Sequence, residues 1–257
     1  MESTQENNHR GFGNIVPGAF TMGNLVCGFL AILAVSDGEI ITACWLIILA
    51  AFLDLLDGKV ARLSGYTSKF GLELDSLADF LSFGIAPAVL VHTIKLKGMG
   101  NWGWIIGIVY IMAASFRLAR YNLMSQSDEK KCFVGLPAPA AALTMVTFII
   151  FSYEIWGDLQ YSEYLVSMVI GFAALMVSQV EFETVPDRLK GKSGRIVSII
   201  ILVIVVGAVI NAKLTLFPIM ALYILGFMAR EMIRLFSKGV EKARGRTSQS
   251  PDDSDFD

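Results

Sequence analysis

Four aspartates lie within 26 residues in a strongly apolar part of the chain. They are Asp54, Asp57, Asp75 and Asp79, in the stretch FLDLLDGKVARLSGYTSKFGLELDSLAD that begins at Phe52. Asp54 follows an apolar run with no hydrophilic break, so hydropathy puts its carboxylate at or just inside a membrane. Ionisable groups are expensive at that depth, which makes each of them a functional candidate.

The spacing of the aspartates predicts that they meet. Asp54 and Asp57 are three residues apart and share one face of a helix, and Asp75 and Asp79, four apart, share a face of the next one. The intervening GYTSKFG contains two glycines and small polar residues, which indicates a tight turn. An antiparallel helix pair would therefore gather all four carboxylates into one cluster.

Such a cluster is suited to divalent cations. Carboxylates this close repel one another, and a bound cation is an economical way to keep them ionised. The three cysteines and two histidines show no metal-ligand spacing, so the ligands are oxygens, which favour Mg²⁺ or Mn²⁺ over zinc. Four carboxylates around two ions is an arrangement suited to phosphoryl chemistry.

The residues beside the aspartates suit a phosphate ligand. Gly58 lets a ligand approach the backbone closely, Arg62 supplies a forked donor for phosphate oxygens, and Ser68 offers a hydroxyl in the turn. A lone aspartate can pair with a lysine of another helix, and two can cap helix ends. Four on facing helices, with glycine and arginine between them, indicate a functional site instead.

These residues form the pattern D-x2-D-G-x2-A-R-x8-G-x3-D-x3-D, which resembles the signature of the CDP-alcohol phosphatidyltransferase family. Within that family, four further stretches resemble the integral-membrane phosphatidylserine synthases. They are FTMGNLVCGFLAI from 20 to 32, DFLSFGIAPA from 79 to 88, SFRLARYN from 115 to 122 and FVGLPAPAAA from 133 to 142. The resemblance implies a six-helix core over 14–180 and a homodimer.

The resemblance also implies a reaction and roles for the signature residues. The phosphatidyl group of CDP-diacylglycerol would pass to L-serine with release of CMP, by direct in-line attack and without a covalent enzyme intermediate. Two ions of Mg²⁺ or Mn²⁺ would be bound by Asp54, Asp57 and Asp75. Asp79 would contribute to the second ion and act as the general base that takes the proton of the serine hydroxyl. Gly58, Arg62 and Ser68 would contact the diphosphate of CDP-diacylglycerol.

The acceptor pocket needs a cation, because serine brings a carboxylate. The candidates near the cytoplasmic end of the fourth apolar run are Arg117, Arg120, Asn122 and Lys131. Alternatively, the two arginines reach lipid headgroups or follow the bias of positive charge towards the cytoplasm. Arg120 and Lys131 can also bind the lipid phosphate.

The first apolar run carries two polar candidates. Thr21 and Asn24 are expected to touch the nucleotide of CDP-diacylglycerol. Hydrogen bonding between helices is an equally good reading of both residues.

The elements that must position these residues are membrane helices. Of the 257 residues 54% are hydrophobic and only 17% are charged, against roughly 25% charged in soluble domains; the mean hydropathy is +0.60. A spanning helix needs about 20 mostly apolar residues. We therefore predict an all-α polytopic membrane bundle of about eight spans, at 14–36, 40–58, 72–96, 102–121, 135–153, 162–180, 196–211 and 214–236.

Charge predicts the orientation of this bundle. With both termini in the cytoplasm, 18 of the 21 lysines and arginines fall on the cytoplasmic side, together with the aspartates. We expect a cytoplasmic segment at 1–13, the core at 14–180, a basic loop with two further membrane helices at 181–236, and a disordered cytoplasmic tail at 237–257. No signal peptide is expected, and the subfamily resemblance implies a bacterial inner membrane.

Two rival functions follow from the same residues. The chain could use another acceptor with the same chemistry, such as glycerol 3-phosphate or an inositol phosphate, although few cations surround the cluster. A carboxylate-lined cation transporter would need ionisable groups at mid-membrane on several helices, whereas these aspartates gather at one end. Membrane lipids are expected as partners, and nucleic acid is not.

Overall fold

The part of the chain that the structure describes is helical apart from one very short strand pair. The computed structural model describes residues 6–64, 69–125, 133–178, 181–182, 211–226 and 228–229. The helices are α1 (Glu6–Ser36), α2 (Ile40–Ser64), α3 (Lys69–Asp79), α4 (Ala86–Ile94), α5 (Asn101–Ser125), α6 (Ala138–Trp156) and α7 (Glu163–Val177). A π-helical segment η1 (Phe80–Ile85) joins α3 to α4, and a 3-10 turn η2 (Leu96–Met99) precedes α5. A further helix covers Asn211–Gly226.

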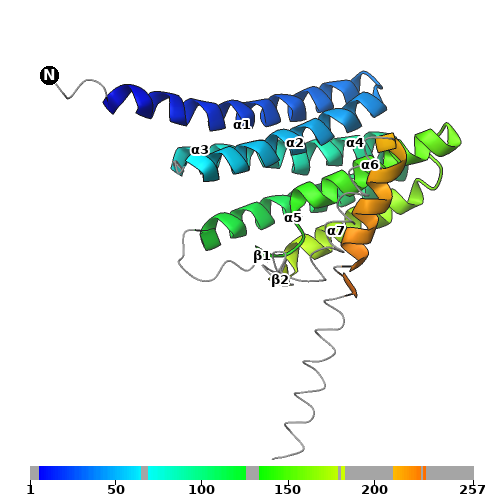
Figure 1. Cartoon of the computed structure of the whole chain (residues 1–257). Coiled ribbons are helices and arrows are strands. Elements are labelled where there is room, and N and C mark those ends of the chain that lie inside the picture. The colour runs from blue at the N-terminus through cyan, green and yellow to red at the C-terminus, as the bar shows by residue number, and fades with distance from the viewer. Residues whose placement is uncertain are drawn as a thin grey trace, which may run out of the picture.

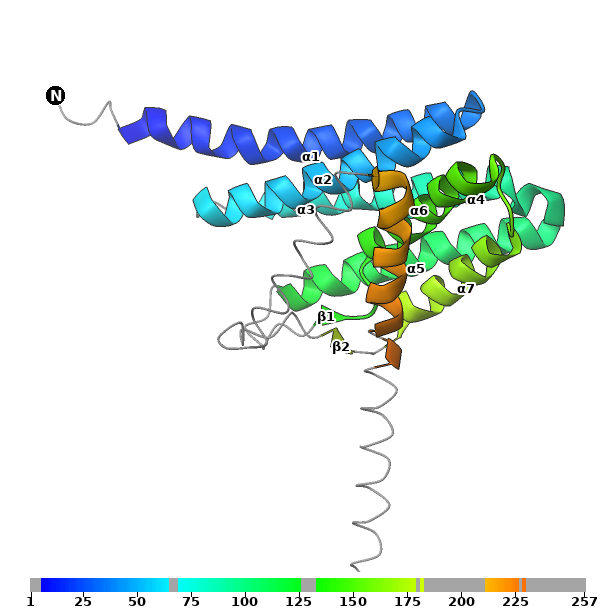
Figure 2. The same ribbon diagram turned by 45° about the vertical axis from the view of Figure 1, so that its right-hand side comes forward.

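The long helices lie side by side in an elongated bundle (Figure 1). α1 and α2 form a hairpin whose tight turn contains Gly38 at φ +82°, a conformation that favours glycine. α3, η1 and α4 form one continuous span that returns along this hairpin, and α5 follows. The helix Asn211–Gly226, drawn in orange, crosses the others steeply (Figure 2).

Five of the described helical spans are long and apolar enough to cross a membrane. They are Gly18–Ser36, Ile40–Val60, Phe70–Ile94, Asn101–Met124 and Ala138–Trp156. Large apolar side chains such as Phe29, Phe52 and Met112 are more than half exposed, as lipid-facing residues are. The predicted all-α membrane helix bundle is confirmed.

The first six expected spans coincide with described helices. α7 and the helix Asn211–Gly226 are apolar but shorter. The expected fifth span begins three residues late, because Pro137 is extended at ψ 133° and α6 starts only after it. The expected span 196–211 lies outside the described residues apart from its last one, and the span 214–236 is described only as far as Gly226 and at 228–229.

Small residues allow the helices to pack closely. The buried residues of α1 and α2 include Ala31, Ala34, Ala43 and Cys44, a composition typical of helix interfaces in membranes. The approach of α1 to η1 is also close.

At that approach, a Cβ added to Gly28 would lie 2.2 Å from Ser82 Oγ. On the other side of η1, the buried hydroxyl of Tyr110 donates a hydrogen bond to Phe83 O at 3.1 Å. Both contacts fix the segment that directly follows Asp79.

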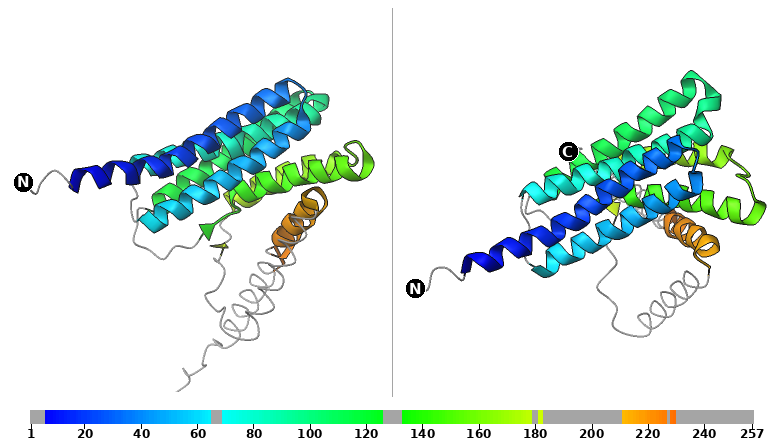
Figure 3. Two further views of the ribbon diagram at one scale, coloured as in Figure 1. Left: turned by 45° about the horizontal axis from the view of Figure 1, so that its top comes forward. Right: turned by 90° about the horizontal axis from the view of Figure 1, so that it is seen from above.

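The two ends of the bundle differ in character. At one end Lys95 pairs with Glu163 at 2.6 Å and Lys213 pairs with Glu154 at 2.8 Å. The other end, which we call the cluster end, holds the C-terminus of α2, the N-terminus of α3 and the strand pair β1 (Phe133–Val134) and β2 (Glu181–Phe182) (Figure 3).

Candidate active site

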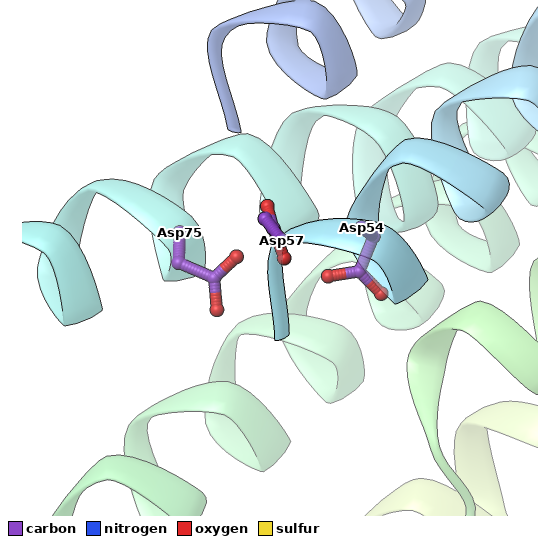
Figure 4. A group of neighbouring side chains, drawn as sticks. All are labelled: Asp54, Asp57 and Asp75. Atoms are coloured by element: carbon purple, nitrogen blue, oxygen red, sulfur yellow. The ribbon is translucent and has the colours of Figure 1, made fainter. Parts of the chain in front are cut away.

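Three of the four aspartates form a compact group at the cluster end. Asp54 and Asp57 project from α2, and Asp75 projects from α3. One carboxylate oxygen from each residue can be chosen so that all three oxygens lie within 4.8 Å of one another. Figure 4 shows the three carboxyl groups facing the space between the two helices. The antiparallel hairpin expected from the spacing thus brings the two helices' carboxylates together.

Asp79 lies just outside this group, one turn further along the same span. Its Oδ1 accepts a hydrogen bond from Asn24 Nδ2 at 3.1 Å. Its charge also interacts with those of Asp54 and Asp75. The expected cluster of four is therefore arranged as three carboxylates and a neighbouring fourth.

α1 supplies a hydrogen-bond donor to each part of this arrangement. Thr21 Oγ1 donates to Asp57 Oδ2 at 3.1 Å, and Asn24 donates to Asp79. The two donors are buried and stand three residues apart, on one face of α1. The structure thus contains the interhelical hydrogen bonds foreseen as one reading of these residues. Their contact with the nucleotide stays a prediction.

The chemistry of the three-carboxylate group fits a divalent cation. All its ligand atoms are oxygens, which suits Mg²⁺ or Mn²⁺. Asp75 Oδ1 is buried and finds no hydrogen-bond partner among the described residues. Buried polar atoms are rarely left without a partner, so this oxygen is available as a ligand. The group can hold a metal ion.

Arg117 brings a positive charge to the same region from α5. Its side chain is only 8% exposed. Its guanidinium interacts electrostatically with Asp79 and Asp54 and lies 5.7 Å from the ring centroid of Tyr121. A buried cation requires compensating negative charge, and the two carboxylates supply it here.

Arg120 has contacts of a different kind. Its guanidinium donates to Met176 O and Ser178 O, each at 3.2 Å, and to Val177 O at 3.4 Å. These carbonyls end α7, and such groups need donors from outside the helix. Gly135, at φ +87°, makes room, because an added Cβ would lie 2.5 Å from Arg120 Nη2. Arg120 therefore links α5 to the C-terminus of α7 by hydrogen bonds.

The remaining predicted site residues divide into described and undescribed ones. Asn122 Nδ2 donates to Ser76 Oγ at 2.9 Å, which joins α5 to α3 beside Asp75. Gly58 follows Asp57 within α2, and Arg62 stands in the last turn of that helix, although its side chain is outside the described part. Ser68 and Lys131 lie outside the described residues.

Two buried residues that join η1 and its neighbouring helices were missing from the sequence prediction. Ser82 Oγ donates to the backbone carbonyl of Asn24 at 3.0 Å, and Tyr110 bonds the backbone of η1. Each is a polar side chain within an apolar run, a signal that is visible in the sequence but does not name a partner.

Comparison with known proteins decides the family. A family model described as CDP-alcohol phosphatidyltransferase matches residues 14–180. The chain belongs to the CDP-alcohol phosphatidyltransferase family. This confirms the family resemblance of the aspartate signature, and with the five apolar spans it makes the chain an integral membrane protein.

Several relatives from this CDP-alcohol phosphatidyltransferase family carry the name CDP-diacylglycerol–serine O-phosphatidyltransferase. One from Helicobacter pylori is 32% identical over 171 residues, covering 65% of this chain and 71% of its own. One from Bacillus subtilis is 32% identical over 170 residues, covering 66% and 90%. An archaetidylserine synthase from Methanothermobacter thermautotrophicus is 34% identical over 173 residues, covering 66% and 70%.

Proposed function

We propose that this enzyme transfers the phosphatidyl group of CDP-diacylglycerol to the hydroxyl of L-serine, giving phosphatidylserine and CMP. The observation that carries the proposal is the group formed by Asp54, Asp57 and Asp75, with Asp79 beside it and Arg117 buried opposite. The names of the relatives favour serine as the acceptor over glycerol 3-phosphate or an inositol phosphate.

The metal-binding role belongs to the three-carboxylate group. Asp54, Asp57 and Asp75 would hold a divalent ion, Mg²⁺ or Mn²⁺, and Asp79 would contribute to a second one. Bound cations offset the negative charge that gathers on the diphosphate as the reaction proceeds. The hydroxyl of Thr21 donates to Oδ2 of Asp57 and so restrains this carboxylate, as supporting hydrogen bonds commonly do for metal ligands.

The proton-transfer role belongs to Asp79. A serine hydroxyl is a weak nucleophile at neutral pH, and a carboxylate within hydrogen-bond reach can accept its proton during attack. The serine oxygen forms a bond to the phosphorus on the diacylglycerol side, and the bond from that phosphorus to the CMP oxygen breaks. The serine proton passes to Asp79, and CMP leaves with the electron pair of the broken bond.

The substrate-binding roles belong to neighbouring residues. Gly58, Arg62 and Ser68 would contact the diphosphate of CDP-diacylglycerol. Arg117 would receive the serine carboxylate, since its guanidinium is buried close to Asp79 and is suited to forked binding of a carboxylate. Arg120, Asn122 and Lys131 stay candidates for serine or lipid phosphate, and the contacts of Arg120 and Asn122 with other helices make Arg117 the stronger one.

The setting of the reaction follows from the charge distribution. We propose a bacterial inner membrane on the subfamily resemblance. The cluster end and both termini would lie in the cytoplasm, because most lysines and arginines then lie on the cytoplasmic side. The lipid tails of the substrate can stay in the bilayer while the nucleotide faces the cytoplasm. The division at 14–180 and 181–236 and a homodimeric assembly belong to the same proposal.

The experiment that tests the function is an assay of CMP release. Purified protein is incubated with CDP-diacylglycerol, Mn²⁺ or Mg²⁺, and serine, glycerol 3-phosphate or an inositol phosphate. We expect release that depends on serine and that is abolished in Asp79→Asn. Release with a phosphorylated acceptor but not with serine would keep the family chemistry and overturn the acceptor. No release from folded protein with any acceptor would overturn the enzyme proposal.

A further inference from the structure

Asn24 is the most deeply buried polar residue that touches the aspartates. Its side chain has 0% exposure, in the middle of an apolar helix. Its Nδ2 donates to Asp79 Oδ1 at 3.1 Å, while its Oδ1 is buried and finds no partner among the described residues. Burying an amide with one unsatisfied atom is unfavourable, so packing alone is a poor reason for asparagine at this position.

The backbone around Asn24 is fixed to the segment that carries Asp79. Ser82 Oγ donates to the carbonyl oxygen of Asn24 at 3.0 Å. Gly28, one turn further along α1, permits this approach, because an added Cβ would lie 2.9 Å from the Cα of Ser82. Ser82 therefore joins η1 to α1 through the backbone of Asn24, a contact separate from the one that the Asn24 amide makes with Asp79.

We infer that Asn24 is a positioning residue for the general base. Its amide donates to Oδ1 of Asp79 and so fixes the orientation of the carboxylate that would accept the proton of the serine hydroxyl, while the side chain of Asp54 hydrogen-bonds the same carboxyl group. Thr21 donates a corresponding hydrogen bond to Asp57 within the three-carboxylate group. α1 thus carries two separate supports, one for the three-carboxylate group and one for Asp79. This inference rests on the proposed function and adds a residue role to it.

The test separates positioning from nucleotide binding and from packing. Asn24→Ala and the nearly isosteric Asn24→Leu are measured for serine-dependent CMP release, for thermal unfolding, and for Mn²⁺ binding without substrate. We expect kcat to fall by about 10- to 100-fold, the usual effect of losing such a support, with the KM for CDP-diacylglycerol changed less than about threefold. Mn²⁺ affinity of the three-carboxylate group should stay at the wild-type value in both variants and fall about tenfold in Thr21→Val.

Ser82→Ala is the matched control, because it removes a hydrogen bond from the same buried contact and leaves the Asn24 amide in place. It should lower the melting temperature and keep kcat within about threefold of wild type.

Four outcomes would overturn the inference. They are a raised KM for CDP-diacylglycerol at unchanged kcat, a loss of Mn²⁺ affinity equal to that of Thr21→Val, an equal fall of kcat in Ser82→Ala, and wild-type rates in folded Asn24 variants. Wild-type protein that releases no CMP with serine would instead overturn the proposed function, and the inference with it.

Discussion

Within the aspartate cluster, the carboxylates occupy different environments. Asp57 is 6% exposed and accepts a hydrogen bond from Thr21, whereas Asp75 carries a buried oxygen with no partner among the described residues. Asp79 is held by Asn24 from α1. These differences give each carboxylate a distinct task that substitution can separate.

Removing a carboxylate from the three-carboxylate group should greatly weaken metal binding. Asp57→Asn and Asp75→Asn leave two carboxylates, too few for a tight oxygen-ligand site. We expect Mn²⁺ affinity to fall by more than about 100-fold, beyond the effect of losing a supporting residue. Mn²⁺ titration followed by electron paramagnetic resonance measures this.

Glu73→Gln is the matched control for that titration. Glu73 is an exposed acid on α3, two residues from Asp75 and outside the three-carboxylate group. The Glu73→Gln variant should bind Mn²⁺ with unchanged affinity. Equal losses from Glu73→Gln and Asp75→Asn would argue for general attraction of cations instead of a site.

Replacing Arg117 should weaken serine binding specifically. Arg117→Ala and Arg117→Lys both lose the forked geometry that suits a carboxylate, and lysine is a poor substitute at such a site. We expect the KM for serine to rise at least about tenfold, as for the loss of a buried charge partner. The KM for CDP-diacylglycerol should change far less. Steady-state kinetics with both substrates provide the measurement, and an unchanged KM for serine would contradict the assignment.

At the scale of elements, the ends of α5 and α7 are joined by a single side chain. Arg120 donates to three carbonyls that end α7, and Gly135 gives it space. Asn122 joins α5 to α3 in a similar way. The C-terminal turns of α5 thus link the helix of Asp75 with a helix about 100 residues further along the chain.

The loss of Arg120 should therefore affect stability more than serine recognition. Arg120→Ala leaves carbonyls of α7 without their donor, which costs about 1–3 kcal/mol for each group that becomes unsatisfied. We expect a clear fall in the melting temperature in detergent, with the KM for serine within about threefold of wild type. Gly135→Ala should lower the melting temperature too, since its Cβ would collide with the same guanidinium. A large rise in the KM for serine at unchanged stability would contradict this and indicate that Arg120 binds serine in the acceptor pocket.

The sequence was a good guide to the helices and to the aspartates, because both depend on local patterns. Continuous apolar runs predict spans, and spacings of three and four residues predict a shared face. The π-helical segment η1 could not be foreseen in the same way. Its geometry depends on Gly28 and Tyr110, which are far from it in sequence and contact it only in the folded bundle.

The hydrogen bonds from α1 to the aspartates could not be predicted from the sequence for a related reason. Thr21 and Asn24 were visible as polar residues in an apolar run, but choosing between a ligand and another helix requires the packing of α1 against α2 and α3. The sequence makes Arg120 one of several candidates for the acceptor pocket, but it does not show its partners in the fold, the last carbonyls of α7.

At the scale of the whole molecule, the ion pairs and the aspartates occupy opposite ends. Lys95 and Lys213 pair with glutamates at one end, and the three-carboxylate group lies towards the other. The proposed orientation puts the ion pairs outside the cell.

That orientation predicts which single cysteines can be labelled in intact cells. In a variant whose native cysteines are replaced by alanine, Gly98→Cys should react with a membrane-impermeant maleimide added from outside. Met124→Cys, in an exposed position near the cluster end, should react only after the cells are opened. Serine-dependent CMP release by both variants is the control for correct folding. The reverse labelling pattern would overturn the orientation.

The position of the carboxylates at one end has a consequence for the membrane itself. A reaction confined to one face delivers each new headgroup into a single leaflet, and lipid headgroups cross a bilayer slowly because their charge must leave water. If the proposed function and orientation hold, this enzyme creates a difference in composition between the two leaflets at the moment of synthesis. The orientation of the helix bundle would then determine which leaflet receives the new lipid, before any other protein redistributes it.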